Sequence, residues 1–195
     1  MNKGTSMIQD KAPREHRDIG QVIRKGLLII HTGDGKGKTT AALGTAFRAL
    51  GRNFNVAMVQ FIKGKWKPAE LKSAELFGER MVVYPMGDGF TWKTQNFEQD
   101  VASARKAWEK CKEILVNPKF QLVIFDELNY VMKYNFLPVA QVLEGLKQKP
   151  ALTHVIITGR GAPQELIDMA DLVTEMKCIK HPYQQGIKAQ PGIEY

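Results

Sequence analysis

His31-Thr32-Gly33-Asp34-Gly35-Lys36-Gly37-Lys38-Thr39-Thr40 is the stretch of sequence that determines the fold. It follows the apolar residues 27–30 and precedes the helix-like residues 41–47. A strand, a glycine-rich turn and a helix start are together the context of a phosphate-binding loop. Backbone N–H groups of such a loop surround phosphate oxygens, and the helix N-terminus adds positive potential. The stretch therefore predicts a nucleoside triphosphate as the ligand.

Two side chains of this loop suggest specific contacts. Lys38 can reach the phosphates, and the Thr39 hydroxyl can take a Mg²⁺ position. The loop departs from the general pattern at Thr32, which stands where a glycine is usual, so that Gly33 is the first glycine. Because a β-branched residue resists positive φ, we expect the loop to curve differently from that of an ordinary NTPase. The alternative is a glycine-rich turn without a ligand, which the Gly-Lys-Thr-Thr ending disfavours.

Length and composition indicate one globular domain. The chain has 195 residues, enough to bury a full core, and 44% of them are hydrophobic, as is usual in soluble proteins. Cys111 and Cys178 form neither a metal-ligand pair nor a redox motif, which favours a cytoplasmic location. Residues 1–18 are polar and lack a signal-peptide core, and no run approaches the length needed to span a membrane.

The N-terminal segment differs from the rest of the chain. Residues 1–25 lack steady periodicity and include six basic residues, so we predict a flexible or conditionally ordered arm. Residues 26–195 are predicted to form a single P-loop domain. The net charge of +8 can attract nucleic acid, but it suits polyanionic small molecules such as ATP equally well.

Short apolar runs predict a parallel sheet. They cover residues 27–30, 56–61, 81–84, 121–126, 154–158 and 172–176. The clearest helix spans residues 97–116, where one apolar face includes Trp108 and Cys111 as expected core residues. Strands alternating with helices indicate an α/β fold with a mostly parallel sheet of about six strands and helices on both faces. Ligands of such sheets bind beyond the carboxyl ends of the strands.

Asp126 and Glu127 form an acidic pair at the end of an apolar run. P-loop proteins place a carboxylate near the nucleotide's metal in this way. Either residue can hold Mg²⁺, directly or through water. The alternative is that Asp126 caps the following helix, and the two roles are compatible.

Three loops follow predicted strands and should face the same cleft. They cover residues 60–64, 87–92 and 158–163. Arg160 stands between glycines with little to pack against, which favours a phosphate contact. Phe90 and Trp92 lie in a glycine-flanked loop, where aromatic side chains usually contact a ligand or partner, although one of them can instead anchor the loop.

Taken in order, these motifs closely resemble the CobA/BtuR class of ATP:corrinoid adenosyltransferases over residues 26–195. The matching stretches are residues 32–40, 60–64, 89–92, 126–128 and 158–161 and the tail Lys188-Ala189-Gln190-Pro191-Gly192-Ile193-Glu194-Tyr195. Thr32 departs from the general P-loop pattern but agrees with this class. The resemblance implies a RecA-like P-loop fold.

The resemblance also implies an unusual use of ATP. Members of this class transfer the 5′-deoxyadenosyl group to Co(I) of a corrinoid such as cobalamin, cobinamide or cobyrinic acid diamide, and release triphosphate. The ATP-binding residues would be Thr32, Gly33, Asp34, Gly35, Lys36, Gly37, Lys38, Thr39 and Thr40. Lys36, Lys38 and Arg160 would neutralise the triphosphate together with Mg²⁺ or Mn²⁺. Thr39 and either Asp126 or Glu127 would hold the metal.

For the corrinoid and the partners, the resemblance implies further roles. Phe90 and Trp92 would pack against the lower face of the corrinoid, exclude its axial ligand and ease reduction of Co(II). The basic arm would fold over the corrinoid. The expected partners are an electron-donating flavoprotein such as a flavodoxin and a second copy of the chain in a homodimer. No association with a membrane is expected.

Two other classes of function fit parts of the sequence. A RecA-like ATPase acting on nucleic acid would explain the P-loop, the acidic pair and the positive charge, and would show strongly salt-dependent binding. A nucleotide-binding module or a small-molecule kinase is the other, although a kinase would normally add an arginine-rich lid, which is not evident. The ordered set of motifs favours the adenosyltransferase.

Overall fold

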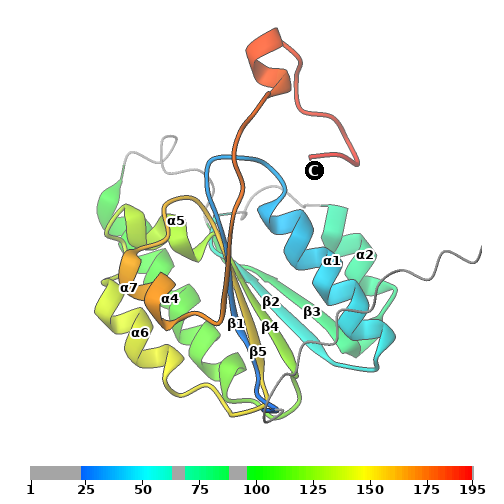
Figure 1. Cartoon of the computed structure of the whole chain (residues 1–195), viewed down its shortest axis with the longest axis vertical. Coiled ribbons are helices and arrows are strands. Elements are labelled where there is room, and N and C mark those ends of the chain that lie inside the picture. Colours follow the sequence, from blue (N-terminus) through cyan, green and yellow to red (C-terminus); the bar gives the residue numbers. More distant parts are fainter. Residues whose placement is uncertain (1–22, 63–68, 88–95, 195) are drawn as a thin grey trace, which may run out of the picture.

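The protein is built around one parallel sheet (Figure 1). The computed structural model describes residues 23–62, 69–87 and 96–194. The strands lie in the order β3-β2-β4-β5-β1-β6, and every neighbouring pair is parallel. Their bounds are β1 Leu28–Thr32, β2 Val56–Gln60, β3 Met81–Pro85, β4 Leu122–Asp126, β5 His154–Thr158 and β6 Leu172–Glu175. The six predicted strands and the parallel sheet are confirmed.

Helices cover both faces of the sheet, as predicted (Figure 1). One face carries α1 (Lys38–Gly51) and α2 (Ala69–Glu75). The other carries α4 (Phe97–Leu115), α5 (Leu128–Lys133), α6 (Val139–Leu146) and α7 (Gln164–Met169). Two short 3₁₀ turns, η1 (Gly78–Arg80) and η2 (Pro182–Gln185), also lie in the described residues. Within the described part of the chain, no helix has the length and apolar character needed to cross a membrane.

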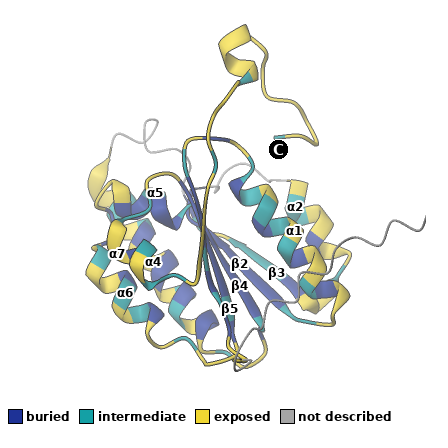
Figure 2. Ribbon diagram, viewed as in Figure 1, coloured by how far each residue is buried: buried dark blue, intermediate teal, exposed yellow. Residues whose placement is uncertain are grey.

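The four inner strands β2, β4, β5 and β1 are largely buried because helices cover both faces, whereas the edge strand β6 is exposed (Figure 2). Alternate side chains of β2 illustrate this, since Met58 packs in the cluster beneath α1 and Val59 in the cluster beneath α4. Trp108 of α4 is fully buried, and its ring meets that of Phe125 edge-on with centroids 6.0 Å apart. Burial also raises the pKa of the Cys111 thiol well above its usual value. The predicted helix and its core residues are confirmed.

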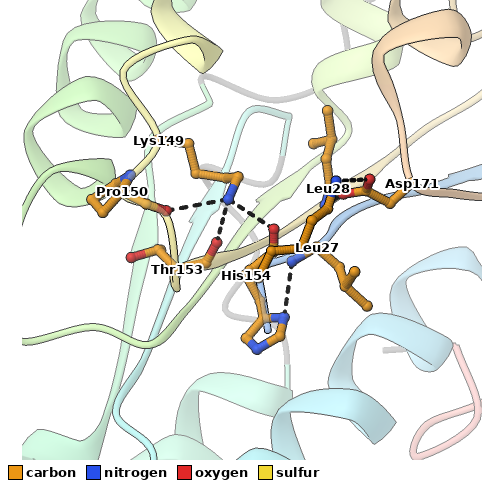
Figure 3. Close-up of polar contacts among 9 residues, drawn as sticks. Leu27, Leu28, Lys149, Pro150, Thr153, His154 and Asp171 are labelled. Carbon is orange, nitrogen blue, oxygen red and sulfur yellow. Dashed lines mark hydrogen bonds and ion pairs between the residues drawn. The ribbon is translucent and has the colours of Figure 1, made fainter. Parts of the chain in front are cut away.

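The amino-terminal edge of the sheet is held by a cluster of polar side chains (Figure 3). The Lys149 ammonium donates to the carbonyl oxygens of Gly26, Pro150 and Thr153 at 2.8, 3.2 and 3.0 Å. His154 Nδ1 accepts from the Leu27 N–H at 3.1 Å. Burial and the charge of Lys149 lower the pKa of His154, so its ring stays neutral and able to accept.

A second contact fixes the start of β1. The Asp171 carboxylate accepts from the Leu28 N–H at 2.9 Å and forms an ion pair with Lys25. Hydrogen bonding by Lys25 and by this backbone group lowers the pKa of Asp171. β1 is therefore tied to β5 and to the entry of β6 at the edge opposite the glycine-rich loop, which sets where that loop begins.

Replacing Lys149 by Met should destabilise the fold. The substitution keeps the aliphatic stem but removes the donor that joins three carbonyl groups. We expect the free energy of unfolding, measured in urea, to fall by about 1–3 kcal/mol. Lys147→Met is the matched control, because Lys147 is exposed and pairs with Glu144 one turn away on the surface. A loss of equal size in both variants would contradict the anchoring role of Lys149.

Candidate functional site

The glycine-rich loop joins β1 to α1 at the carboxyl edge of the sheet. Gly33 and Gly37 have φ of 92° and 103°, a region that favours glycine. The Gly35 N–H donates to the carbonyl oxygen of Met176 at 2.7 Å. A Cβ on Gly35 would lie 2.7 Å from the carbonyl oxygens of Met176 and Lys177. The loop therefore packs tightly on the segment that follows β6.

Thr32 is the last residue of β1 and stands where a phosphate-binding loop usually has a glycine. Its backbone and hydroxyl contacts show how a threonine fits there. It is not among the residues with positive φ, and its hydroxyl accepts from the Ala162 N–H at 3.1 Å. This hydrogen bond links the first turn of the loop to the segment after β5. A glycine at this position would lose that link.

Lys38 is the first residue of α1, and its ammonium is buried within the loop. It donates to the carbonyl oxygens of Gly33 and Gly35 at 2.8 and 2.6 Å. Burial lowers the pKa of Lys38, the nearby carboxylates of Glu127 and Asp34 raise it, and the cations of Arg160 and Lys36 lower it. The ammonium thus holds the loop closed around the place where phosphate oxygens would bind.

The Asp126 carboxylate lies fully buried at the end of β4. Its Oδ1 accepts from the hydroxyls of Thr39 and Thr158, both at 2.8 Å. Its Oδ2 accepts from Gln60 Nε2 at 3.4 Å, and the same amide nitrogen donates to Glu70 at 3.0 Å. These donors supply hydrogen-bond partners to both oxygens of the buried carboxylate.

Glu127, rather than Asp126, occupies the N-cap position of α5, and its side chain makes no capping hydrogen bond. Capping by Asp126 is therefore wrong, because its side chain turns to Thr39 instead. Glu127 has φ of 65°, a conformation that costs energy for a non-glycine residue. Its N–H donates to the Thr158 hydroxyl at 3.0 Å. This backbone turn directs Glu127 to the cavity beside the loop.

A cavity of about 520 Å³ joins the loop to the groove between α1 and α2. Its polar end is formed by residues 35–40 with Glu127 and Arg160, and its apolar wall includes Leu43, Phe47 and Phe77. The chain beyond η2 turns back over the amino end of α1 (Figure 1). There Glu194 lines the same cavity and pairs with Lys36 at 3.2 Å.

The site suits a hard divalent cation. Thr39, Asp126 and Glu127 offer hydroxyl and carboxylate oxygens, the donors that Mg²⁺ prefers. Among residues 23–62, 69–87 and 96–194, no cluster of three or more His, Cys, Asp or Glu residues is arranged to hold a metal. Phosphate oxygens and water would complete the coordination shell, as is usual for Mg²⁺ in nucleotide sites.

Most of the predicted site residues meet at this cavity. Lys36, Lys38, Thr39, Thr40, Gly35, Gly37, Glu127 and Arg160 line it, and Asp126 lies behind Thr39. Thr32, Gly33 and Asp34 instead line a separate cavity of about 450 Å³, next to β6. Phe90 and Trp92 lie outside the described residues. The roles of Gln60, Thr158 and Glu194 were not anticipated, although Gln60 and Thr158 are polar residues that each end an apolar run.

Replacing Thr39 by Val should weaken metal-dependent ATP binding. The variant loses the hydroxyl that both offers a metal ligand and donates to buried Asp126. We expect the dissociation constant of ATP, measured calorimetrically with Mg²⁺, to rise roughly ten- to hundredfold.

The control for this substitution is Thr45→Val, because the Thr45 hydroxyl bonds to Ala41 within α1. It should bind ATP like the unaltered protein. Unchanged binding by the Thr39 variant would show that its hydroxyl is not part of the metal site.

Comparison with known proteins gives a consistent match over most of the chain. Residues 24–195 match the family model described as "ATP:corrinoid adenosyltransferase BtuR/CobO/CobP". A corrinoid adenosyltransferase of Sinorhizobium is 47% identical over 191 residues, which is 97% of this chain and 89% of the relative. Corrinoid adenosyltransferase CobA of Salmonella typhimurium is 46% identical over 171 residues, 88% of this chain and 86% of the relative.

Two solved structures share the fold at low sequence identity. The RadB recombinase has a TM-score of 0.51 and 18% identity, covering 79% of this chain and 76% of that one. Flagellar accessory protein FlaH of Methanocaldococcus jannaschii also has a TM-score of 0.51, with 15% identity, covering 78% of this chain and 72% of that one. Both concern the fold alone, and the predicted RecA-like P-loop α/β fold is confirmed.

Proposed function

The chain belongs to the ATP:corrinoid adenosyltransferase family, and we propose that it moves the 5′-deoxyadenosyl group of ATP to the Co(I) centre of a corrinoid substrate. Co(I) supplies both electrons of the new cobalt–carbon bond, and the bond from C5′ to triphosphate breaks with its electron pair on oxygen. The observation that carries this proposal is a single cavity that joins a family-matched phosphate loop to Arg160, Glu127 and an apolar wall.

The protein's contribution would be charge and position. Three cations, Lys36, Lys38 and Arg160, stand around the place for a triphosphate, where they would offset the charge of the leaving group. Lys38 would exchange its carbonyl partners in the loop for phosphate oxygens, and Lys36 would exchange Glu194. Both exchanges keep the ammonium groups paired throughout.

A bound Mg²⁺ or Mn²⁺ would add further positive charge at the triphosphate. Thr39 would hold it together with one carboxylate of the acidic pair Asp126 and Glu127. The hydrogen bond from Thr39 to Asp126 supports this arrangement, since it leaves the hydroxyl lone pairs free to face a cation.

The chemistry needs no protein nucleophile, because the cobalt itself attacks carbon. Cys111 supports this interpretation, since it is buried in the core with a raised pKa and lies away from the cavity. Binding geometry would then account for most of the rate.

Purified protein, MgATP and chemically reduced cob(I)alamin, mixed without oxygen, test the reaction directly. We expect a light-sensitive adenosylated corrinoid and one triphosphate per product, followed by absorbance and chromatography. Lys38→Ala should lose this activity, and the surface control Lys147→Met should keep it. Release of ADP and phosphate that rises with added DNA or RNA would overturn the proposal and favour a nucleic-acid ATPase.

Phe90 and Trp92 would exclude the axial ligand of the corrinoid and so ease reduction of Co(II) to Co(I) by the electron donor. The described structure resumes at Asn96. The ring centroids of Phe97 and Phe136 there lie 5.5 Å apart, and those of Tyr134 and Phe136 lie 6.1 Å apart. Because aromatic rings stack on flat molecules, this aromatic cluster supports the proposal that the planar corrinoid binds nearby.

Alanine at both Phe90 and Trp92 should abolish turnover from Co(II) with a weak reductant. Turnover from preformed Co(I) should be largely retained, because only exclusion of the axial ligand is lost. Comparing the two rates in the same preparation provides the internal control. Unchanged turnover from Co(II) would remove this role.

The partners would be a flavoprotein such as a flavodoxin, which supplies electrons, and a second copy of the chain in a homodimer. Exposed apolar side chains on and beyond β6, among them Leu172, Ile179 and Tyr183, support such an interface. The basic arm over residues 1–25 would fold over the corrinoid, and the enzyme would act in the cytoplasm.

A further inference from the structure

A row of polar side chains ends the buried strands on the face covered by α1. Gln60, Asp126, Thr158 and His31 are each at or near the carboxyl end of their strand, and all are buried. Sheet register pairs Gln60 with Asp126 and Thr158 with His31. The row lies between the apolar sheet and the phosphate loop. A polar group buried there without a hydrogen-bond partner would destabilise the fold.

Thr158 is the member of this row that contacts both acidic residues. Its hydroxyl donates to Asp126 Oδ1 at 2.8 Å and accepts from the Glu127 N–H at 3.0 Å. The side chain is fully buried. One hydroxyl thus fixes the carboxylate of the first acid and the backbone of the second.

The second of these contacts stabilises a strained turn. Glu127 keeps φ of 65° although it is not glycine, and the bond from its N–H to Thr158 is one of the constraints that hold it there. If this turn relaxed, the Glu127 side chain would leave the polar end of the cavity. The first contact acts together with Thr39, because both hydroxyls donate to the same oxygen of Asp126.

Gln60, at the other end of the row, also contacts Asp126. Gln60 is fully buried, and its amide nitrogen donates to Asp126 while its Oε1 has no hydrogen-bond partner within the described structure. A buried carbonyl oxygen of this kind usually has a water or ligand partner. The row therefore has both a fixed carboxylate and an unused acceptor below the phosphate loop.

We propose that Thr158 is a positioning residue for the metal site, whose hydroxyl sets the Asp126 carboxylate and the Glu127 turn so that Thr39 and the acidic pair present oxygen to one divalent cation. The proposal rests on the proposed function for the identity of the nucleotide. Thr158 touches neither metal nor substrate, and it acts through the two acids and Thr39.

The test compares Thr158→Val, which removes the hydroxyl at nearly constant shape, with Thr158→Ser, which keeps it. For the Val variant we expect the dissociation constant of MnATP, followed by the Mn²⁺ electron paramagnetic resonance signal, to rise about tenfold. ATP binding in the presence of EDTA should change less than about twofold, since the loop itself is intact. The Ser variant should stay within about threefold of the unaltered protein in both measurements.

Kinetic measurements and a matched control variant complete the test. With saturating MgATP and reduced corrinoid, kcat of the Val variant should fall further than kcat of the Ser variant, and added Mn²⁺ should restore part of it. Thr153→Val is the matched control, because it makes the same change at a buried threonine directly before the opposite end of β5. It should bind MnATP normally.

Two results would overturn the assignment. One is metal-dependent ATP binding by Thr158→Val equal to that of the unaltered protein. The other is an equal loss of binding with and without metal in both Thr158 variants, in step with the melting temperature, which would indicate a role in folding only. Since these binding measurements need no corrinoid, failure of the adenosylation assay would reject the proposed function while leaving this outcome readable.

Discussion

The buried carboxyl group of Asp126 is the constraint on which the rest of the site depends. A carboxylate without access to water is tolerated only when donors surround it, and here the donors come from three different elements. Thr39 belongs to α1, Gln60 to β2 and Thr158 to β5. Satisfying this one group therefore fixes the helix and two strands relative to β4.

The parallel sheet makes this convergence possible. All strands end at the same edge, so the last residues of β2, β4 and β5 lie side by side, and Glu127 and Arg160, which follow β4 and β5, line one cavity. The opposite edge serves a different purpose, since Lys149, His154 and Asp171 hold residues 26–28, where the chain enters β1. The contacts that stabilise the sheet thus lie at the amino ends of the strands, and the candidate ligand site lies at their carboxyl ends.

Much of the fold could be predicted because its signals are local. Apolar runs identified the strands, and the spacing of apolar residues identified α4 with Trp108 inside. Lys38 and Thr39 followed from a motif whose spacing is fixed by phosphate geometry.

The contacts between distant parts of the chain could not be predicted. Nothing near Glu194 indicates that it pairs with Lys36, and nothing near Thr158 indicates that its hydroxyl joins the two acids where β4 gives way to α5. A polar residue that ends an apolar run indicates an edge of the sheet but not its partner. The capping role considered for Asp126 is wrong for the same reason, since its stronger donors lie elsewhere in the chain.

The strand order has a consequence for how the chain folds. β1 comes first in the sequence but pairs with β5 and β6. Its first contacts, Leu27 with His154 and Leu28 with Asp171, join residues 127 and 143 positions apart. On a ribosome, β1 must therefore wait with its apolar residues exposed until most of the chain has emerged, a delay that favours chaperone capture. The ATP site is consequently among the last parts of the molecule to form.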